Sequence, residues 1–328
     1  MAVGNKRKPT VTCHTCQTTC NRFGKHRNGL QRYRCAVCRK TFTEDHTHPL
    51  SAMRLPIDKA TTILKLLVEG MSIRSIERIT QVHRDTIMRV LIAAGEKAGR
   101  VMDERFQNLR PKYLQCDEIW TYVQKKNRHV RKGDAPEFGD QWVFVALDEE
   151  TKLVAHFEIG KRTKETTLTF LGGLKARLSE DRFQITTDGY HFYRSIQGIF
   201  AGQADFAQLV KLFGDYGQFE NAEGRYSPPR ITEVISKVVD GRPDEDHIST
   251  SFVERQNLTM RMQLRRFTRL TNAFSKKLSH LKAAVALHFA YYNLCRVHSS
   301  LRVTPAMQAG ISDHVWAIEE LIGTVAVY

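Results

Sequence analysis

The sequence predicts a multidomain chain in which a zinc ribbon and a helix-turn-helix unit precede a larger mixed α/β layer. Three observations predict it. Two Cys-x2-Cys pairs lie within the first 40 residues, helical periodicity runs from Ile57 to Leu91, and β-branched and aromatic segments then alternate with helical ones. With 328 residues, 41% of them hydrophobic, the chain is long enough to bury the cores of two or three domains.

The chain is strongly basic, and its charge is unevenly distributed. It has 50 Lys and Arg against 35 Asp and Glu, a formal net charge of +15. Residues 1–112 hold 22 basic and 9 acidic side chains, 113–253 hold 18 and 22, and 254–328 hold 10 and 4. Such an excess favours polyanionic partners, nucleic acid first and acidic membranes second. Because no apolar run approaches the roughly 18 residues that span a bilayer, and no signal peptide is visible, we expect a cytoplasmic protein without a membrane partner.

The first predicted element is a zinc ribbon over residues 1–48. Four of the seven cysteines have the spacing of tetrahedral zinc ligands, namely Cys13, Cys16, Cys35 and Cys38. In a reducing cytosol these are expected to be thiolate ligands of one structural Zn²⁺ rather than disulfides. Cys20 and His14 lie close enough in sequence to compete as ligands. Arg32 and Arg34, beside the second pair, suit contacts with phosphates.

A helix-turn-helix unit is predicted over residues 49–108. This range begins within a polar linker at 43–56. One helix begins at Ile57 and ends near Gly70, and Ser72 is a suitable N-cap for a short second helix. Gln81-Val82 makes a tight turn before a third helix. Its Arg84 and Arg89 would face a DNA major groove. A plain three-helix packing unit is the alternative, but the adjacent ribbon and the basic charge favour DNA binding.

The middle of the chain predicts a mixed α/β layer. Strands are expected at 113–123, 141–148, 152–159, 183–187 and 206–212, with helices around 163–178 and from about 192. Three antiparallel strands followed by alternating helix and strand are typical of such a layer. A further helix is expected over 251–270, and 283–292 is apolar and helical.

Three carboxylates are candidates for chemistry. Asp117 lies in the first strand, Asp188 follows a strand directly before Gly189, and Glu254 opens the helix at 251–270. Converging carboxylates hold Mg²⁺ or Mn²⁺, and two such ions can catalyse phosphodiester displacement. The choice is not selective on composition, because residues 113–253 alone contain 22 acids.

Two other acids are assigned different roles. Asp148 is expected to cap a turn, and Glu118 is expected to point to the opposite face of the strand from Asp117. On the predicted helix, Arg261 and Arg265 fall within about 20° of Glu254. That face would present an acid and two cations to a negatively charged ligand.

The chain resembles DDE transposases of the insertion-sequence-one family over nearly its whole length. The resemblance rests on both Cys pairs with Gln31-Arg32-Tyr33-Arg34-Cys35, the helix-turn-helix, Asp117-Glu118-x-Trp120, Thr187-Asp188-Gly189, Val253-Glu254-Arg255-Gln256-Asn257-x3-Arg261 and Arg266-x2-Arg269-x-Thr271-x2-Phe274-Ser275-Lys276. The strings around Asp117 and Glu254 are its specific part, since ribbons and helix-turn-helix units occur in many regulators.

The resemblance implies a ribonuclease-H-like, retroviral-integrase-like catalytic domain at 109–310, with an insertion at about 215–248 and a C-terminal helix or tail at 311–328. It implies Asp117, Asp188 and Glu254 as catalytic ligands of two Mg²⁺ or Mn²⁺ ions. Arg261 stands where the wider group has Lys or Arg, and Asn257 is a helper at the metal or the DNA. The implied partners are double-stranded DNA, as terminal inverted repeats and target, and a second copy of the chain.

Some features depart from the family or stand outside the site. Family members commonly join finger and catalytic parts by frameshifting, whereas this chain is continuous. The string Asn293-x2-Arg296-x-His298-x2-Leu301-x2-Thr304-Pro305-Ala306 also occurs near the C-termini of related bacterial transposases, and His298 is expected to make local hydrogen bonds. Two alternatives to a transposase are a DNA-binding regulator that has lost its chemistry and a metal-dependent nuclease without strand joining.

Overall fold

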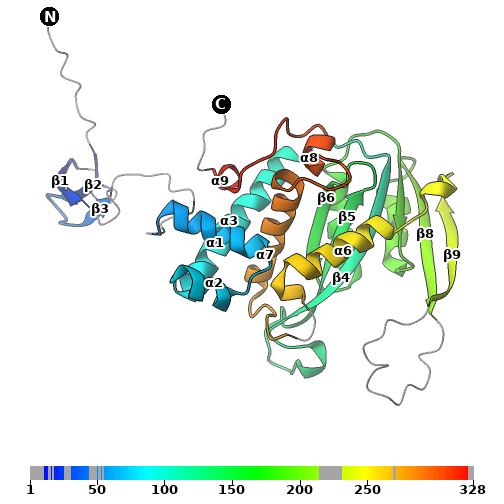
Figure 1. The fold of residues 1–328 in the computed structure, drawn as a ribbon, viewed down its shortest axis with the longest axis horizontal. Coiled ribbons are helices and arrows are strands. Elements are labelled where there is room, and N and C mark those ends of the chain that lie inside the picture. Colours follow the sequence, from blue (N-terminus) through cyan, green and yellow to red (C-terminus); the bar gives the residue numbers. More distant parts are fainter. Residues whose placement is uncertain are drawn as a thin grey trace, which may run out of the picture. The chain divides into compact units, whose positions relative to one another are not determined.

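The computed structural model of the protein shows two compact units, residues 1–60 and 61–328, drawn in Figure 1. It describes residues 11–323 except 14, 15, 17, 26–30, 44–49, 51, 52, 54, 214–230, 269 and 270. The predictions for His14, for most of the linker and for residues 215–230 therefore lie outside the described residues.

The first unit is a small antiparallel ribbon. Its strands β1 (Cys20–Lys25), β2 (Gln31–Cys35) and β3 (Thr41–Thr43) pair in the order β1-β2-β3. Its buried cluster consists of Cys13, Cys20, Tyr33 and Cys35. So small a buried cluster contributes little stability to a separate unit.

Three helices follow the ribbon: α1 (Ile57–Val68), whose first four residues precede the boundary between the units, and then α2 (Ile73–Thr80) and α3 (Arg84–Arg105) in the second unit. The Ser72 hydroxyl caps α2 by accepting a hydrogen bond from the Ser75 N–H at 3.1 Å. Gln81, at φ 55°, ends α2 in the left-handed conformation. Residues 81–83 form a tight connection between α2 and α3, where the sequence predicts a turn, and the assignment of these helices as a DNA-binding helix-turn-helix stays a prediction.

Helix α3 continues past the helix-turn-helix and packs against α7 (Leu278–Ala290). Gly95 makes this approach possible, because a Cβ there would lie 2.3 Å from the Ala283 carbonyl oxygen. Helices α2 and α3 therefore belong to the same compact unit as the strands, and the domain boundary near residue 108 stays a prediction.

A six-stranded mixed sheet forms the centre of the second unit. Its strands are β4 (Tyr113–Val123), β5 (Gly139–Asp148), β6 (Val154–Gly160), β7 (Phe183–Thr187), β8 (Ala204–Phe213) and β9 (Ile231–Asp240). They lie in the order β6-β5-β4-β7-β8-β9; β4, β7 and β8 run parallel and the other pairs are antiparallel. This mixed sheet is compatible with a ribonuclease-H-like domain. Part of the stretch predicted as an insertion forms β9, an edge strand.

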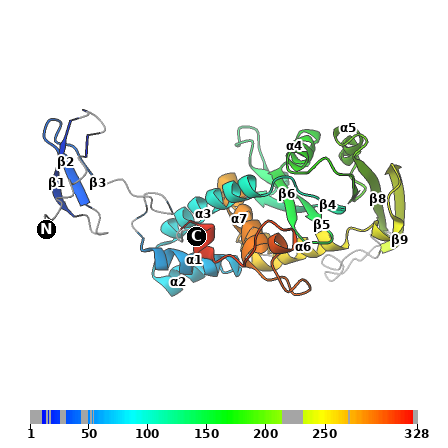
Figure 2. The same ribbon diagram turned by 90° about the horizontal axis from the view of Figure 1, so that it is seen from above.

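Helices cover both faces of the sheet. Figure 2 shows α4 (Lys164–Lys175) and α5 (Ile196–Ile199) on one face and α6 (Ser251–Gln263) on the other. The short helices α8 (Pro305–Gln308) and α9 (Ile318–Leu321) complete the unit. None of the described helices is long and apolar enough to cross a membrane.

The predicted helix at 251–270 is shorter than expected. Helix α6 ends at Gln263, and Leu264 adopts an extended conformation at φ −106° and ψ 102°. The bend allows both Leu264 and Phe267 to be buried. Arg265 therefore lies beyond the helix and does not share a helical face with Glu254, so that part of the prediction is wrong.

Candidate metal centres and nucleic-acid interface

Two neighbouring parallel strands bring Asp117 and Asp188 together. Cys116 of β4 pairs with Thr187, the last residue of β7, and the next residue along the chain is an aspartate in both cases. The turn after β7 is fixed by two hydrogen bonds. Asp188 Oδ1 accepts one from the Tyr190 N–H at 2.9 Å, and Gln208 Nε2 donates one to the Asp188 carbonyl at 3.0 Å.

Glu118 joins these two aspartates. Oxygens of Asp117, Glu118 and Asp188 all lie within 4.8 Å of one another. Glu118 is predicted to point to the opposite face of β4 from Asp117, and its carboxylate meets Arg162 whereas that of Asp117 meets Asn257; its oxygen nevertheless reaches the two aspartates because of where β7 ends. Ladder pairing between β4 and β7 stops at Cys116 and Thr187, so no β7 backbone separates the two faces of β4 beside Glu118.

Burial and crowding make the charged forms of these acids unfavourable. Burial, and then the neighbouring Asp188, raise the pKa of Asp117 to about 7 and that of Glu118 to about 8. Among the described residues, Glu118 Oε1 and Asn257 Oδ1 are buried and have no hydrogen-bond partner. Buried oxygens without donors fit a hard divalent cation such as Mg²⁺ or Mn²⁺.

Arg162 lies against the same cluster. Its Nη2 is 3.0 Å from Glu118 Oε2 and 3.5 Å from Asp188 Oδ2. Its guanidinium carbon lies 4.0 Å from the centre of the Tyr190 ring. Arg162 supplies a positive charge where a cation would otherwise bind. The sequence gives no signal for it, because it lies in the short connection between β6 and α4.

Glu254 stands beside the cluster rather than within it. Its side chain is exposed, forms an ion pair with Lys211 of β8, and accepts a hydrogen bond from the Thr250 hydroxyl at 2.6 Å. It is nevertheless close enough that its charge contributes to the raised pKa of Asp117, after burial and Asp188. The structure thus brings Asp117 and Asp188 together and leaves the full trio a prediction.

Helix α6 is attached directly to β4. The buried Gln115 Oε1 accepts hydrogen bonds from the N–H groups of Phe252 at 2.9 Å and Val253 at 3.2 Å. One turn after Glu254, Asn257 Nδ2 donates to Asp117 Oδ2 at 2.8 Å. Asn257, predicted as a helper at metal or DNA, therefore orients a carboxylate of the cluster. Arg261 lies on the same helix, in its last turn.

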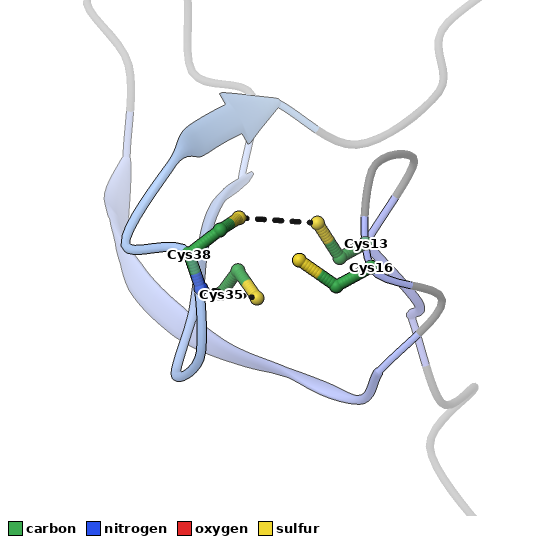
Figure 3. Close-up of side chains that lie close together, drawn as sticks. All are labelled: Cys13, Cys16, Cys35 and Cys38. Atoms are coloured by element: carbon green, nitrogen blue, oxygen red, sulfur yellow. Dashed lines mark hydrogen bonds between the residues drawn. The ribbon is translucent and has the colours of Figure 1, made fainter.

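The four predicted zinc ligands converge in the ribbon. Figure 3 shows Cys13, Cys16, Cys35 and Cys38 facing one another. All four sulfurs lie within 4.8 Å of each other, and those of Cys13 and Cys38 are 3.6 Å apart. Sulfurs on one tetrahedral zinc are separated by about 3.8 Å, so the cluster fits the ion.

Two observations concern which cysteines could bind a metal here. Hydrogen bonds from the Thr18 hydroxyl and the Cys38 N–H lower the pKa of Cys35 to about 6, which favours a thiolate. Cys20 lies outside the four, and its thiol donates to the Thr18 carbonyl at 3.6 Å. Of the two competing ligands suggested by the sequence, Cys20 is therefore not part of the group.

The predicted DNA contacts of the ribbon share its outer face. Alternation along β2 buries Tyr33 and Cys35 and turns Arg32 and Arg34 outward. Their guanidinium carbons lie 5.3 and 5.1 Å from the centre of the Phe23 ring. The ring holds two cations side by side on one surface.

Arg84 and Arg89 are exposed in the first two turns of α3. Arg84 and Arg265, far apart in sequence, line one pocket of about 740 Å³. Further cations in its lining are Arg74, Arg266 and Lys276, and no acid is among the described lining residues. Burial lowers the pKa of Arg266 to about 10, still well above neutrality. The pocket therefore suits an anion.

Comparison with known proteins gives only distant likenesses. No protein-family model and no curated protein matches the chain. Among solved structures, it is similar to piggyBac transposase in a synaptic complex with hairpin DNA, at TM-score 0.36 and 12% identity, covering 82% of this chain and 70% of that one. It is also similar to a pre-cleavage Mos1 transpososome, at TM-score 0.21 and 11% identity, covering 50% of this chain and 62% of that one. The Mos1 Strand Transfer Complex gives TM-score 0.20, 13% identity and coverages of 49% and 60%.

Proposed function

We propose that the protein is a DNA transposase that binds the terminal inverted repeats of an insertion sequence and catalyses metal-dependent strand cleavage and strand transfer. The observation that carries the proposal is the carboxylate cluster of Asp117, Glu118 and Asp188, whose oxygens lie within 4.8 Å of one another. Nothing in DNA binding alone requires buried acids next to the phosphates of a polyanion.

In this proposal Asp117 and Asp188 hold Mg²⁺ or Mn²⁺, with Glu254 as the third catalytic ligand and Glu118 as an additional oxygen donor. When bound, such ions stabilise the charge that develops as a phosphodiester is attacked and its leaving oxygen departs. Asn257 keeps the Asp117 carboxylate in place through its 2.8 Å hydrogen bond. For Glu254 to reach the cluster, its ion pair with Lys211 has to open.

The surrounding charges divide the work of holding DNA. Arg32 and Arg34 of the ribbon and Arg84 and Arg89 of α3 would bind the repeats, with base contacts from α3 and phosphate contacts from the ribbon. The pocket lined by Arg84 and Arg265 would hold backbone phosphate between the recognition helix and the segment after α6. Pairing two DNA ends further implies at least a homodimer.

The test uses purified protein, Mg²⁺ and a duplex carrying the repeats that flank the gene. Wild type should nick the repeat boundary and join the exposed 3′ end to a plasmid. Asp188→Asn should reduce both steps at least about 10³-fold, because it removes a metal ligand, whereas Glu180→Gln, which neutralises an exposed acid on the connection after α4, should leave both unchanged.

Each of the other outcomes would indicate a different function. Cleavage without joining would identify a nuclease, and repeat binding without cleavage would identify a regulator. Equal processing by wild type and Asp188→Asn would refute the catalytic role of the cluster.

A further inference from the structure

A second basic pocket lies along α6, away from the carboxylates. Its volume is about 700 Å³, and its positively charged or titratable lining consists of Lys152, Arg255, Arg296 and His298. No acid is among the described residues that line it. Positive groups thus gather here, with Glu149 and Asp148 near enough that their charges oppose the lowering of the Lys152 pKa by burial.

One side of α6 contacts the carboxylate cluster, and another side lines the pocket. At 100° per residue, Asn257 lies about 60° from Glu254, on the side of the helix that contacts Asp117. Arg255 and Thr259 lie about 100–140° from Glu254 in the other sense, and both line the pocket. A helix with its side chains is about 10–12 Å thick, so a group bound in the pocket is separate from one bound at the carboxylates.

The C-terminal string of the sequence, at 293–306, supplies a third of the lining of this pocket, and other residues of the string have a structural task. Asn293 clamps β6, accepting from the Val154 N–H and donating to the Val154 carbonyl, both at 3.0 Å. The Thr304 hydroxyl caps α8 by accepting from the Met307 N–H at 3.2 Å. His298 makes a local hydrogen bond, as the sequence predicts, between its Nδ1 and the Ser300 hydroxyl at 3.0 Å, and both Arg296 and His298 line the pocket.

Two buried donors in the lining lack acceptors. Among the described residues, Arg296 Nη1 and Gln256 Nε2 are buried without a hydrogen-bond partner. The Gln256 side chain belongs to a residue that is only 3% exposed. Because leaving a buried donor unpaired is costly, and both orphan atoms are donors, the pocket is built for a ligand that supplies acceptors.

The remaining lining agrees with an anionic ligand that has apolar parts. Burial, and then the charges of Lys152 and Arg296, lower the pKa of His298, which places the three groups close together. Leu147, Phe252 and Met262 add apolar surface, on which a deoxyribose ring can pack. Arginines contact phosphate through pairs of parallel hydrogen bonds.

We propose that this pocket binds a backbone phosphodiester of DNA at nucleotides other than those being cut, with Arg255 and Arg296 as its main contacts. This inference rests on the proposed function for the identity of the polyanion. Because α6 carries Glu254 on its other side, the pocket fixes the path of the DNA relative to the cluster. The bound phosphate belongs either to the transposon end or to the target.

The test measures DNA affinity as a function of salt. Arg255→Gln, Arg296→Gln and the double variant are compared with Arg302→Gln, an exposed arginine of the same C-terminal segment outside the pocket. If the bound phosphate belongs to the transposon end, the double variant should bind a fluorescent duplex of the repeat-bearing end about 10-fold more weakly at about 0.15 M NaCl. Its plot of log affinity against log salt should be shallower by about 0.9 for each phosphate that the variant no longer neutralises. Arg302→Gln should match wild type.

A second measurement separates the two sources of phosphate, namely the joining of pre-cut transposon ends to a supercoiled plasmid by wild type and by the double variant. If the double variant binds the end duplex more weakly than wild type, the pocket holds the transposon end. If it binds the end duplex as wild type does but joins ends to the plasmid about 10-fold or more slowly, the pocket holds the target DNA.

Unchanged salt slope and unchanged joining in the double variant, with wild type active, would overturn the inference and leave the proposed function standing. If wild type neither cuts nor joins but the slope still falls, the proposed function fails while the DNA pocket stands. Should the double variant fail to fold, the exposed Arg255→Gln alone gives the same readout, with an expected slope change in the same direction.

Discussion

At the scale of single residues, the site is a balance between three acids and one arginine. Arg162 pairs with both Glu118 and Asp188, yet burial still raises the pKa of Glu118 to about 8. One guanidinium does not offset three crowded carboxylates. A divalent cation would offset the negative charge of the carboxylates more fully, and the buried Glu118 Oε1, which has no hydrogen-bond partner among the described residues, could coordinate it.

Metal binding should therefore depend strongly on pH. In the metal-free protein, the pKa values of Asp117 and Glu118, about 7 and about 8, mean that both carboxyls hold protons near pH 6 and lose them as the pH rises to about 8.5. Because ligands bind metals only when deprotonated, Mn²⁺ affinity measured by calorimetry should rise about 10-fold or more between those two pH values. A flat profile would show that these carboxyls are not ligands.

The same raised pKa values predict the sign of a stability effect. Between about pH 4.5 and pH 8 the folded state binds protons that the unfolded state has released, so this contribution to stability falls as pH rises. Added Mg²⁺ should reverse the loss. The rise in Tm on adding Mg²⁺ should thus be larger at about pH 8.5 than at about pH 6, and should vanish in an Asp117→Asn, Asp188→Asn double variant.

Glu118 also shows where residue patterns stop being informative. Strand alternation correctly places consecutive Cβ atoms on opposite faces, but it carries no information about where a neighbouring strand ends. Asp148, by contrast, behaves as predicted, accepting from the Glu150 N–H and the Thr151 hydroxyl. A local turn is readable from local sequence, whereas a shared site depends on the register of β4 with β7.

At the scale of elements, α3 packs closely against α7. Gly95→Ala should destabilise the protein by about 1–3 kcal/mol, because the added methyl group overlaps the Ala283 backbone and overpacking costs that much. Gly99→Ala, on the same helix, meets nothing within 4 Å and should stabilise it by up to about 1 kcal/mol. Urea denaturation gives both values; equal effects would contradict the close crossing.

The elements differ in how far sequence predicts them. Strands β4 and β7 match their predicted bounds, because both are rich in β-branched and aromatic residues, and an Asp-Gly follows β7. Strand β9 is not predicted, since its side chains are mostly exposed and it carries no core-facing alternation. The end of α6 is missed because the apolar spacing that continues to Phe267 serves a bend instead of a longer helix.

At the scale of the whole molecule, we expect the ribbon and the larger unit to unfold independently. The ribbon's buried cluster is four side chains, whereas the second unit has a continuous core under its six-stranded sheet. Chelating zinc should unfold residues 11–43 and abolish repeat binding, while hydrogen exchange over β4–β8 stays unchanged. Loss of protection in the sheet, or undiminished repeat binding, would contradict this division.

At this scale, the acidic and basic segments of the chain correspond to different sites in the structure. The acidic middle of the chain supplies the carboxylate cluster, and the basic ends supply Arg32, Arg34 and Arg84 before it and Arg255 and Arg296 after it. Sequence composition predicts a polyanionic partner. It does not predict that residues from both basic ends, Arg84 and Arg265, line one pocket, because that depends on how α3 packs against the segment after α6.

The most direct test of the proposed metal site is a crystal structure grown with Mn²⁺ and a repeat-end duplex, read by the anomalous signal of manganese. We predict a peak about 2.1 Å from oxygens of Asp117 and Asp188, with Arg162 withdrawn from Glu118. With the duplex bound, an absent peak and an intact pair between Arg162 and Glu118 would contradict a catalytic metal centre at these carboxylates.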